Sequence, residues 1–551
     1  MTSPAVTSPS EPWLGSQPPR GAFPRAFWIL ALVGLLLRLM LLWMPILEDN
    51  SQVRQTQTAV AAQAYLVNGW WPPETRANWR GDLDARFLQE LPLYNYAAAG
   101  LATLTGNLDV AGRLVSALLW LASFFVLQLL WRPFLSEAEA FWANVLFVFA
   151  PLSIAYGQAF MPEMAIQLAA FLFLYLGWSY VREPGLGKLT LLGLVGLVGI
   201  TLKLPEVSHL YVLFFVLLLL KDGWRAFLKP AYWVLLIVTV VVTKLWSGYL
   251  DTANSPHFEM WSASGNLQDF LGKYGRLLEP KRYVSVGGYV TAFILTPVGL
   301  LLVAWGVIRA WGRGGWRYLP LLWLFSLAFF YLVWGPRTAF THAYYNLPSL
   351  GPLAAMFGIG AVGFLAWTQA RAPALRLALR YGALAVFALL AAAGTYYLVR
   401  PEWTVFRAAK WVEANTAPDD IVLLKSNHIN HLARYPHYAA LPYYSGRRAW
   451  IWMTDSGAIE AEPQHVLATS DWFVELVPDE EPGLLRRLQT MVKARRDIRE
   501  DMSWLTTQPG VKPVHAGDGF KVYRLSQPEA LTPPPDLARP RPEAANARPK
   551  P

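Results

Sequence analysis

The feature that most constrains this chain is a succession of apolar segments, each about as long as a bilayer is thick. Stretches such as 231–250 and 381–398 approach the roughly 20 apolar residues that a transmembrane helix needs. Apolar residues make up 54% of the 551 positions and charged residues only 15%, whereas soluble proteins average about 25% charged residues. The sequence therefore predicts an α-helical polytopic membrane protein. About eleven candidate spans can be placed, at 27–47, 110–131, 140–157, 164–181, 187–202, 207–220, 231–250, 286–311, 318–335, 347–368 and 381–398.

The distribution of Lys and Arg predicts which side of the membrane each connection faces. When alternate connections are assigned to one side, that side collects most of the basic residues in short loops, which is typical of the cytoplasmic face. The N-terminus is then cytoplasmic, and an odd number of spans places three large segments outside: 48–109, 251–285 and everything after about 399. The apolar stretch after Arg25 is too long for a cleavable signal, so we expect a retained first span. The predicted location is the cell inner (plasma) membrane.

Changes in composition divide the chain into four predicted regions. Residues 1–26 are rich in Pro and Ser and are expected to form a disordered cytoplasmic tail, and residues 27–400 hold the spans and their outer loops. Residues 403–525 alternate helix-like and β-rich stretches, which predicts a small extracytoplasmic α/β domain. Residues 526–551 are rich in Pro, Ala and Arg and are expected to be disordered. Three histidines of the α/β region lack the spacing of a zinc site and are interpreted as surface residues: His428, His431 and His437.

The first candidates for chemistry are two adjacent carboxylates, Glu48 and Asp49, directly after the first span. Two acids just outside a bilayer are well placed to act on a lipid-borne substrate. The alternative is that they cap the helix expected over 56–68, because Asp, Asn and Ser favour helix N-termini. Glu163, which follows Pro162 at a break between two spans, has the same two readings, since a helix dipole stabilises an acid at its N-terminus. By the predicted topology Glu163 and Asp49 lie on the same face.

Three further polar groups lie on that predicted face, and each could singly be a loop anchor or a snorkelling residue. Together with Glu48-Asp49 and Glu163 they make five polar groups on one predicted face. A site at the outer membrane surface explains five such groups better than separate loop anchors do. Arg38 is a separate case, because it lies near the middle of the first span, where a charge costs roughly 2.5–3.5 kcal/mol, and it is expected to have a buried partner. The three groups are Glu90 with Leu91-Pro92-Leu93-Tyr94, Lys203 with Leu204-Pro205-Glu206, and Arg337 with His342, Tyr344, Tyr345 and Asn346.

Taken in order, these groups resemble the GT-C class of membrane glycosyltransferases, specifically the bacterial relatives of protein O-mannosyltransferases and lipid A aminoarabinose transferases. The resemblance spans most of residues 27–400 and rests on the order and spacing of short motifs. One position departs from the pattern, since the aminoarabinose transferases have Lys before the first-loop Pro where this chain has Leu91. The matching features are Glu48-Asp49, Arg54-Gln55-Thr56-Gln57-Thr58, Glu90-Leu91-Pro92-Leu93-Tyr94, Phe160-Met161-Pro162-Glu163, Lys203-Leu204-Pro205 and Tyr344-Tyr345-Asn346-Leu347-Pro348.

The resemblance implies transfer of a sugar from a polyprenyl-phosphate donor to an acceptor hydroxyl at the outer face. Asp49 inherits the role of general base, with Glu48 beside it and Glu163 as a further catalytic carboxylate. A polyprenyl phosphate is already a good leaving group, so the reaction needs one base and cations for the developing phosphate charge, unlike a glycosidase with its two flanking carboxylates. The expected donor-phosphate ligands are Arg54, Lys203, Arg337, His342 and Tyr345.

Cofactor and partners follow from the same resemblance. A divalent ion held by Glu90 or Glu163 would share the task of offsetting phosphate charge, although the sequence has no strong metal motif. The expected partners are a polyprenyl-phosphate-linked sugar donor, a glycan, lipid or protein acceptor, and the lipid bilayer. Nucleic acid is not expected despite the net charge of +10, because the basic residues lie mainly between the apolar runs without a clustered face.

Two alternative functions remain at the level of sequence. A secondary transporter would also combine many spans with polar residues in or near the membrane. Transporters commonly show internal repeats and broken helices at matching positions, and this sequence shows no convincing repeat. An oligosaccharide polymerase or ligase is the second alternative. The large one-sided loops and the appended α/β domain favour an enzyme of the membrane surface.

Overall fold

The chain forms two compact units, each assembled from segments that are distant in sequence. We call them the helical unit (1–43, 90–249 and 263–398) and the sheet unit (44–89, 250–262 and 399–551). The predicted tails lie almost wholly outside the described residues, as do the three histidines of the α/β region. The computed structural model describes residues 23–48, 52–70, 75–83, 85–88, 90–255, 277–313, 318–335, 342–401, 403–425, 439–452, 463–476 and 502–533.

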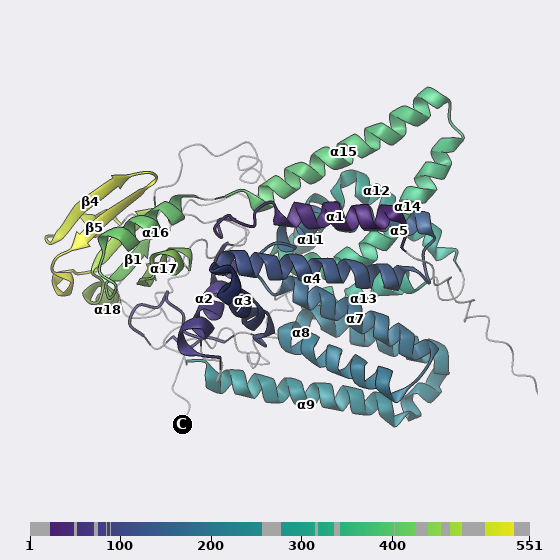
Figure 1. The fold of residues 1–551 in the computed structure, drawn as a ribbon, viewed down its shortest axis with the longest axis horizontal. Coiled ribbons are helices and arrows are strands. Elements are labelled where there is room, and N and C mark those ends of the chain that lie inside the picture. Colours follow the sequence, from purple (N-terminus) through teal and green to yellow (C-terminus); the bar gives the residue numbers. More distant parts are fainter. Residues whose placement is uncertain are drawn as a thin grey trace, which may run out of the picture. The chain divides into compact units, whose positions relative to one another are not determined.

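The helical unit consists mainly of apolar helices that coincide with the predicted spans (Figure 1). Within the described residues, seven helical segments are long and apolar enough to cross a membrane, which confirms a polytopic helical protein. The sequence prediction reached about eleven because it counted α8 as two spans and included three helices of only 13 to 15 residues, α1, α5 and α13. The helices are α1 (Arg25–Leu39), α3 (Leu93–Thr105), α4 (Leu108–Trp131), α5 (Glu137–Phe149), α6 (Pro151–Tyr156), α7 (Glu163–Arg182), α8 (Leu186–Asp222), η1 (Gly223–Leu228), α9 (Pro230–Ala253), α11 (Pro280–Val290), η4 (Thr291–Leu295), α12 (Thr296–Trp311), α13 (Leu319–Val333), η6 (Ala343–Ser349), α14 (Leu350–Gln369) and α15 (Pro373–Val399).

Helix α8 is a helical hairpin. The backbone of Lys203 is extended (φ −165°, ψ 92°), and this interrupts the helix between a first arm (186–202) and a second arm (204–222). A Cβ atom added to Gly196 would lie 2.3 Å from the hydroxyl of Tyr211, and one added to Gly199 would lie 3.2 Å from Val207. Residues 15 positions apart in a straight helix are about 22 Å apart, so the chain must reverse direction at Lys203. The two arms match the separate spans predicted at 187–202 and 207–220.

Arg38 finds its buried partners within the helical unit. Its guanidinium donates hydrogen bonds to the Ser153 hydroxyl at 2.8 Å and to the Gly34 carbonyl at 3.1 Å. It also lies over the Trp120 ring, 3.8 Å from the centroid. A charge in the middle of an apolar helix is thus held by a hydroxyl, a carbonyl and an aromatic face.

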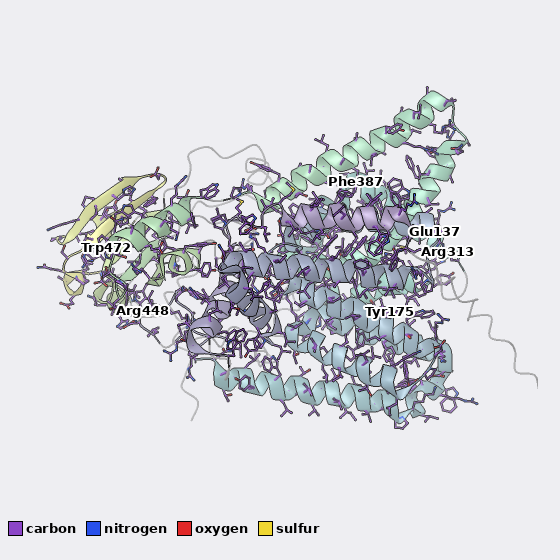
Figure 2. The ribbon with its side chains drawn as sticks, viewed as in Figure 1. Glu137, Tyr175, Arg313, Phe387, Arg448 and Trp472 are labelled. Atoms are coloured by element: carbon purple, nitrogen blue, oxygen red, sulfur yellow. The ribbon has the colours of Figure 1, made fainter. Side chains whose placement is uncertain are left out.

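One end of the helical unit carries an ion pair between two helices. Helix α5 begins with a capping box in which the Ser136 side chain accepts from the backbone of Glu139 and the Glu139 side chain reaches back to the backbone of Ser136. Arg313, just after α12, donates to the same Glu139 carboxylate. Figure 2 shows Arg313 at the same end of the unit as Glu137, the first residue of α5. This contact places the connection between α4 and α5 and the connection after α12 at the same end of the helical unit.

The sheet unit is built around a five-stranded sheet with the strand order β2-β1-β3-β5-β4. Strands β2 (Arg448–Trp452), β1 (Ile421–Lys425) and β3 (Trp472–Leu476) are parallel, while β5 (Phe520–Leu525) and β4 (Val511–Gly517) continue the sheet antiparallel. All five residues of β1 are buried, as expected of a central strand covered on both faces. The helices of this unit are α2 (Gln52–Asn68), α16 (Trp403–Asn415), α17 (Ala440–Ser445), α18 (Pro463–Ala468), α20 (Ser503–Thr506) and η7 (Pro528–Ala530).

Residues of the first loop complete this sheet unit. The backbone of Ala449 in edge strand β2 donates to the Asn78 carbonyl and accepts from the Gly81 N–H, both at 2.8 Å. Gly81 has a positive φ of 55°, and a Cβ atom there would lie 2.0 Å from the Trp450 ring. Trp79 and Phe87 join the apolar cluster on the α16 face of the sheet. Residues 44–89 were predicted as part of the transmembrane domain, and in the structure they belong with the C-terminal domain instead.

Candidate active site

The most buried carboxylate among the predicted site residues of the helical unit is Glu163, which is 1% exposed and begins α7. The residues before it form a short break after α6, and α4 holds this break in place. The Ser116 hydroxyl of α4 donates to the Ala159 carbonyl at 2.6 Å. The same carbonyl also accepts from the Met161 N–H at 2.7 Å, so the break before α7 is held both by its own backbone and by α4.

Lys203 lies opposite Glu163, at the point where the α8 hairpin turns. Its ammonium donates to both Glu163 oxygens, at 2.9 and 3.0 Å, and its Nζ is 2.6 Å from Oε1 of Glu206. The side chains are 10%, 0% and 4% exposed for Lys203, Glu163 and Glu206. Charges this deeply buried are stabilised only when they are paired, so the three residues form one ionic cluster, which we call the ion cluster.

Two tyrosine rings of η6 complete the surroundings of the ammonium. Nζ of Lys203 lies 4.6 Å from the ring centroid of Tyr344 and 4.3 Å from that of Tyr345, within the range of cation–π attraction. His342 stacks on Tyr344 with ring centroids 5.3 Å apart. The structure thus brings together two predicted site residues from one stretch of chain, His342 and Tyr345, with Lys203 and Glu163.

The stretch Glu90 to Tyr94 is tied to the same place by backbone bonds. The Leu91 N–H donates at 3.1 Å to the carbonyl of Thr201, which lies in the last turn of the first α8 arm and has no helical partner of its own. The Tyr94 hydroxyl donates to the Gly112 carbonyl at 2.8 Å, and burial raises the pKa of this hydroxyl, so it remains a donor. Glu90 is close enough to Glu206 to interact with it electrostatically.

Close packing against α4 requires a glycine beside the break. A Cβ atom at Gly112 would lie 2.4 Å from the Phe160 ring. Only a residue without a side chain therefore lets Phe160 and the following Met161-Pro162 pass this close to the helix. The position of Glu163 depends on this contact as well as on the hydrogen bond from Ser116.

The charges of the ion cluster limit what it can bind. Two carboxylates and one ammonium give a formal charge of −1, and both oxygens of Glu163 already accept from Lys203. A metal ion held by Glu163 would have to displace the ammonium. Among the described residues no group of three or more His, Asp or Glu side chains is placed to hold a metal ion.

Two of the remaining predicted site residues lie in the sheet unit, and two lie outside the described residues. Glu48 belongs to the sheet unit, where it is 4% exposed and its Oε2 accepts from the Leu47 N–H and from Nε2 of Gln55, both at 3.1 Å. Arg54 lies in α2 of the same unit. Asp49 and Arg337 lie outside the described residues.

Two members of the site were not among the predicted site residues. Glu206 follows Lys203 at i+3, a spacing that brings side chains together on a helix, but the sequence does not show that both side chains lie beside Glu163. Tyr344 precedes Tyr345 in a motif that was recognised, and only the structure shows that both rings face the same ammonium.

One protein-family model matches part of the chain. The family model described as dolichyl-phosphate-mannose-protein mannosyltransferase matches residues 89–247, a segment that contains Glu90, Glu163, Lys203 and Glu206. No curated protein sequence matches the chain.

Several solved structures share the fold at low sequence identity. ArnT from Cupriavidus metallidurans bound to undecaprenyl phosphate is 14% identical, with 94% of this chain and 100% of that chain covered and a TM-score of 0.55. The oligosaccharyltransferase AglB from Archaeoglobus fulgidus, in complex with an inhibitory peptide and a dolichol-phosphate, is 12% identical, with 91% and 74% covered and a TM-score of 0.52. The arabinofuranosyltransferase AftD from Mycobacteria is 15% identical, with 93% and 40% covered and a TM-score of 0.51.

Proposed function

We propose that this chain, which has the fold of the GT-C class of membrane glycosyltransferases, transfers a sugar from a polyprenyl-phosphate donor to an acceptor hydroxyl at the outer face of the membrane. The observation that carries the proposal is the ion cluster. Its members and the side chains around it come from four of the five polar groups recognised in the sequence, and three of these groups fall within the segment that matches the mannosyltransferase family model. Two of the structures with the same fold hold a polyprenyl phosphate, either undecaprenyl or dolichol phosphate, which supports this class of donor.

In the proposed reaction the bond between the sugar anomeric carbon and the phosphate oxygen breaks, and a bond from that carbon to the acceptor oxygen forms. The polyprenyl phosphate leaves with the electron pair of the broken bond. The acceptor hydroxyl loses its proton to a general base, and we assign this role to Asp49, with Glu48 next to it. A positioned base contributes roughly 10²–10⁴-fold to such a step.

In this proposal the role of Lys203 is to supply a positive charge and to position Glu163. All the close polar contacts of its ammonium in the described structure are to Glu163 and Glu206, so it holds the Glu163 carboxylate in place. Arg54, Arg337, His342 and Tyr345 are proposed to provide the direct contacts to the donor phosphate, for which charge-assisted hydrogen bonds are the strongest available.

Incubation of the purified protein with a panel of polyprenyl-phosphate sugars tests the proposal. We expect at least one donor to be consumed, with release of free polyprenyl phosphate, in the wild type and not in Glu163→Gln. Glu137→Gln is the matched control, because Glu137 also lies in the first turn of a helix but is exposed and remote from the ion cluster. Equal activity in the Glu163 and Glu137 variants would remove the ion cluster from the site, and a panel without any turnover would contradict the proposed reaction.

A further inference from the structure

A small cavity lies beside the ion cluster, on the side of Glu206 that faces away from the turn of α8. It is bounded by α7, the second arm of α8, α13 and η6, and Figure 1 shows α7, α8 and α13 next to one another. The polar side chains that line it are Gln167, Glu206, His209 and Trp323, and the rest of its wall is apolar. Its free space has room for about one water molecule.

The polar atoms on this wall have hydrogen-bonding capacity that the described residues do not fill. Neither ring nitrogen of His209, nor Oε1 of Gln167, nor Nε1 of Trp323 has a hydrogen-bond partner among the residues that the structure describes. Oε1 of Glu206 has Lys203 beside it and, as a carboxylate oxygen, a further lone pair. All four side chains are at most 5% exposed. Buried polar groups without a partner cost about 1–3 kcal/mol each, so four on one wall indicate a ligand.

The inventory of donors and acceptors specifies that ligand. Trp323 is only a donor, and the carboxylate of Glu206 and the amide oxygen of Gln167 are only acceptors. His209 supplies one ring N–H, since it donates from one nitrogen in either neutral tautomer. Two donors and two acceptors match the four hydrogen bonds of one water molecule, which accepts two and donates two.

We propose that these four side chains bind one structural water molecule, and that this water holds the Glu206 carboxylate in the orientation in which it pairs with Lys203. The water site shares Glu206 with the ion cluster, but it does not depend on which reaction the protein catalyses. A metal ion is a weaker fit, because a cation at Glu206 would meet the ammonium of Lys203, which lies 2.6 Å from the same oxygen. His209, Gln167 and Trp323 are then positioning residues that act on the ion cluster through the water.

The direct test is a cryo-electron microscopy map of the full chain in lipid nanodiscs, at a resolution that orders buried water. We expect one isolated density peak at hydrogen-bonding distance, about 2.7–3.2 Å, from a ring nitrogen of His209 and from Oε1 of Glu206. It should also be within reach of Gln167 and Trp323. A cavity without density between well-ordered side chains would overturn the proposal. One equivalent of tightly bound metal per chain, lost in His209→Asn, would overturn it in favour of a cation.

A double-mutant cycle adds a readout that simple loss of packing would not produce. Gln167→Leu and Trp323→Phe each remove one hydrogen-bonding group and keep most of the side-chain volume. Because both groups bind the same water, we expect the melting temperature of the double variant to fall by clearly less than the sum of the two single shifts. Gln167→Leu combined with Trp131→Phe is the matched control pair, since the Trp131 indole N–H is also buried without a described partner but does not line the cavity. Additive shifts in the Gln167→Leu, Trp323→Phe variant, as in this control pair, would contradict a shared water.

Discussion

Replacing Lys203 with methionine separates two roles of this residue that the sequence could not distinguish. The change keeps the apolar stem and removes the ammonium, which leaves the carboxylates of Glu163 and Glu206 buried and facing each other without a cation. Removing one partner of a buried ion pair typically costs about 3–5 kcal/mol of unfolding free energy, because the remaining charge stays unpaired. With side chains only 10%, 0% and 4% exposed, Lys203→Met should fall in that range.

The matched control is Lys188→Met, which breaks another Lys–Glu pair in the same unit. The Nζ of Lys188 lies 3.1 Å from Oε2 of Glu183, a separation close to that in the ion cluster, but the two side chains are 35% and 65% exposed. Surface pairs of this kind contribute about 1 kcal/mol or less. The difference in unfolding free energy lost by the two variants therefore measures the effect of burial, since the charges and the distances from Nζ to the carboxylate oxygen are nearly the same.

Equilibrium unfolding in lipid–detergent mixtures gives the stability, and titration with a non-hydrolysable polyprenyl-phosphate sugar gives the donor affinity of each variant. A triple variant with Lys203→Met, Glu163→Gln and Glu206→Gln should recover most of the lost stability, because a buried pair can be replaced by neutral groups at little cost. If Lys203 were instead only a phosphate ligand, stability would stay unchanged and donor affinity alone would fall by about 1.5–3 kcal/mol. A Lys203→Met variant as stable as Lys188→Met would refute the reasoning from the ion cluster.

Three further predictions concern the base, the packing of the break and the topology. Asp49→Asn keeps the size of the side chain and should reduce sugar transfer by roughly 10²–10⁴-fold without a change in melting temperature, whereas retained activity would leave Asp49 only as a helix cap. Gly112→Ala forces the Phe160 ring to move and should cost about 1–3 kcal/mol of unfolding free energy. In the control Gly185→Ala the new methyl group meets no atom within 4 Å, so the unfolding free energy should change by no more than about 0.5 kcal/mol. In intact cells an impermeant maleimide should label a cysteine at the exposed Ala516 of the sheet unit and not one at the exposed Gly185, and the reverse pattern would overturn the assigned faces.

Apolar periodicity and length predicted where the helices lie, but not how the polar groups between them pair. The hairpin of α8 could be anticipated because Lys203-Leu204-Pro205 follows an apolar run, and proline is disfavoured in a helix interior. The partners of Lys203 could not be anticipated, since Glu163 is 40 residues away and the contact depends on how α7 and α8 pack. The joining of the first loop to strand β2 was also hidden, because Asn78 and Gly81 lie in a stretch without the alternating pattern of a strand.

The helix breaks explain why the site forms where it does. A helix that ends inside an apolar bundle leaves carbonyl groups without partners, and each must be satisfied by the protein itself because lipid offers no hydrogen bonds. Two examples in the described part of the helical unit are the Ala159 carbonyl, which accepts from the Ser116 hydroxyl and the Met161 N–H, and the Thr201 carbonyl, which accepts from the Leu91 N–H. These hydrogen bonds therefore hold α4 against the break before α7, and the first-loop stretch against the end of the first α8 arm. The same convergence places Glu163 next to Lys203, so the interruptions that weaken these helices also create the buried charges from which a phosphate-dependent reaction can be built.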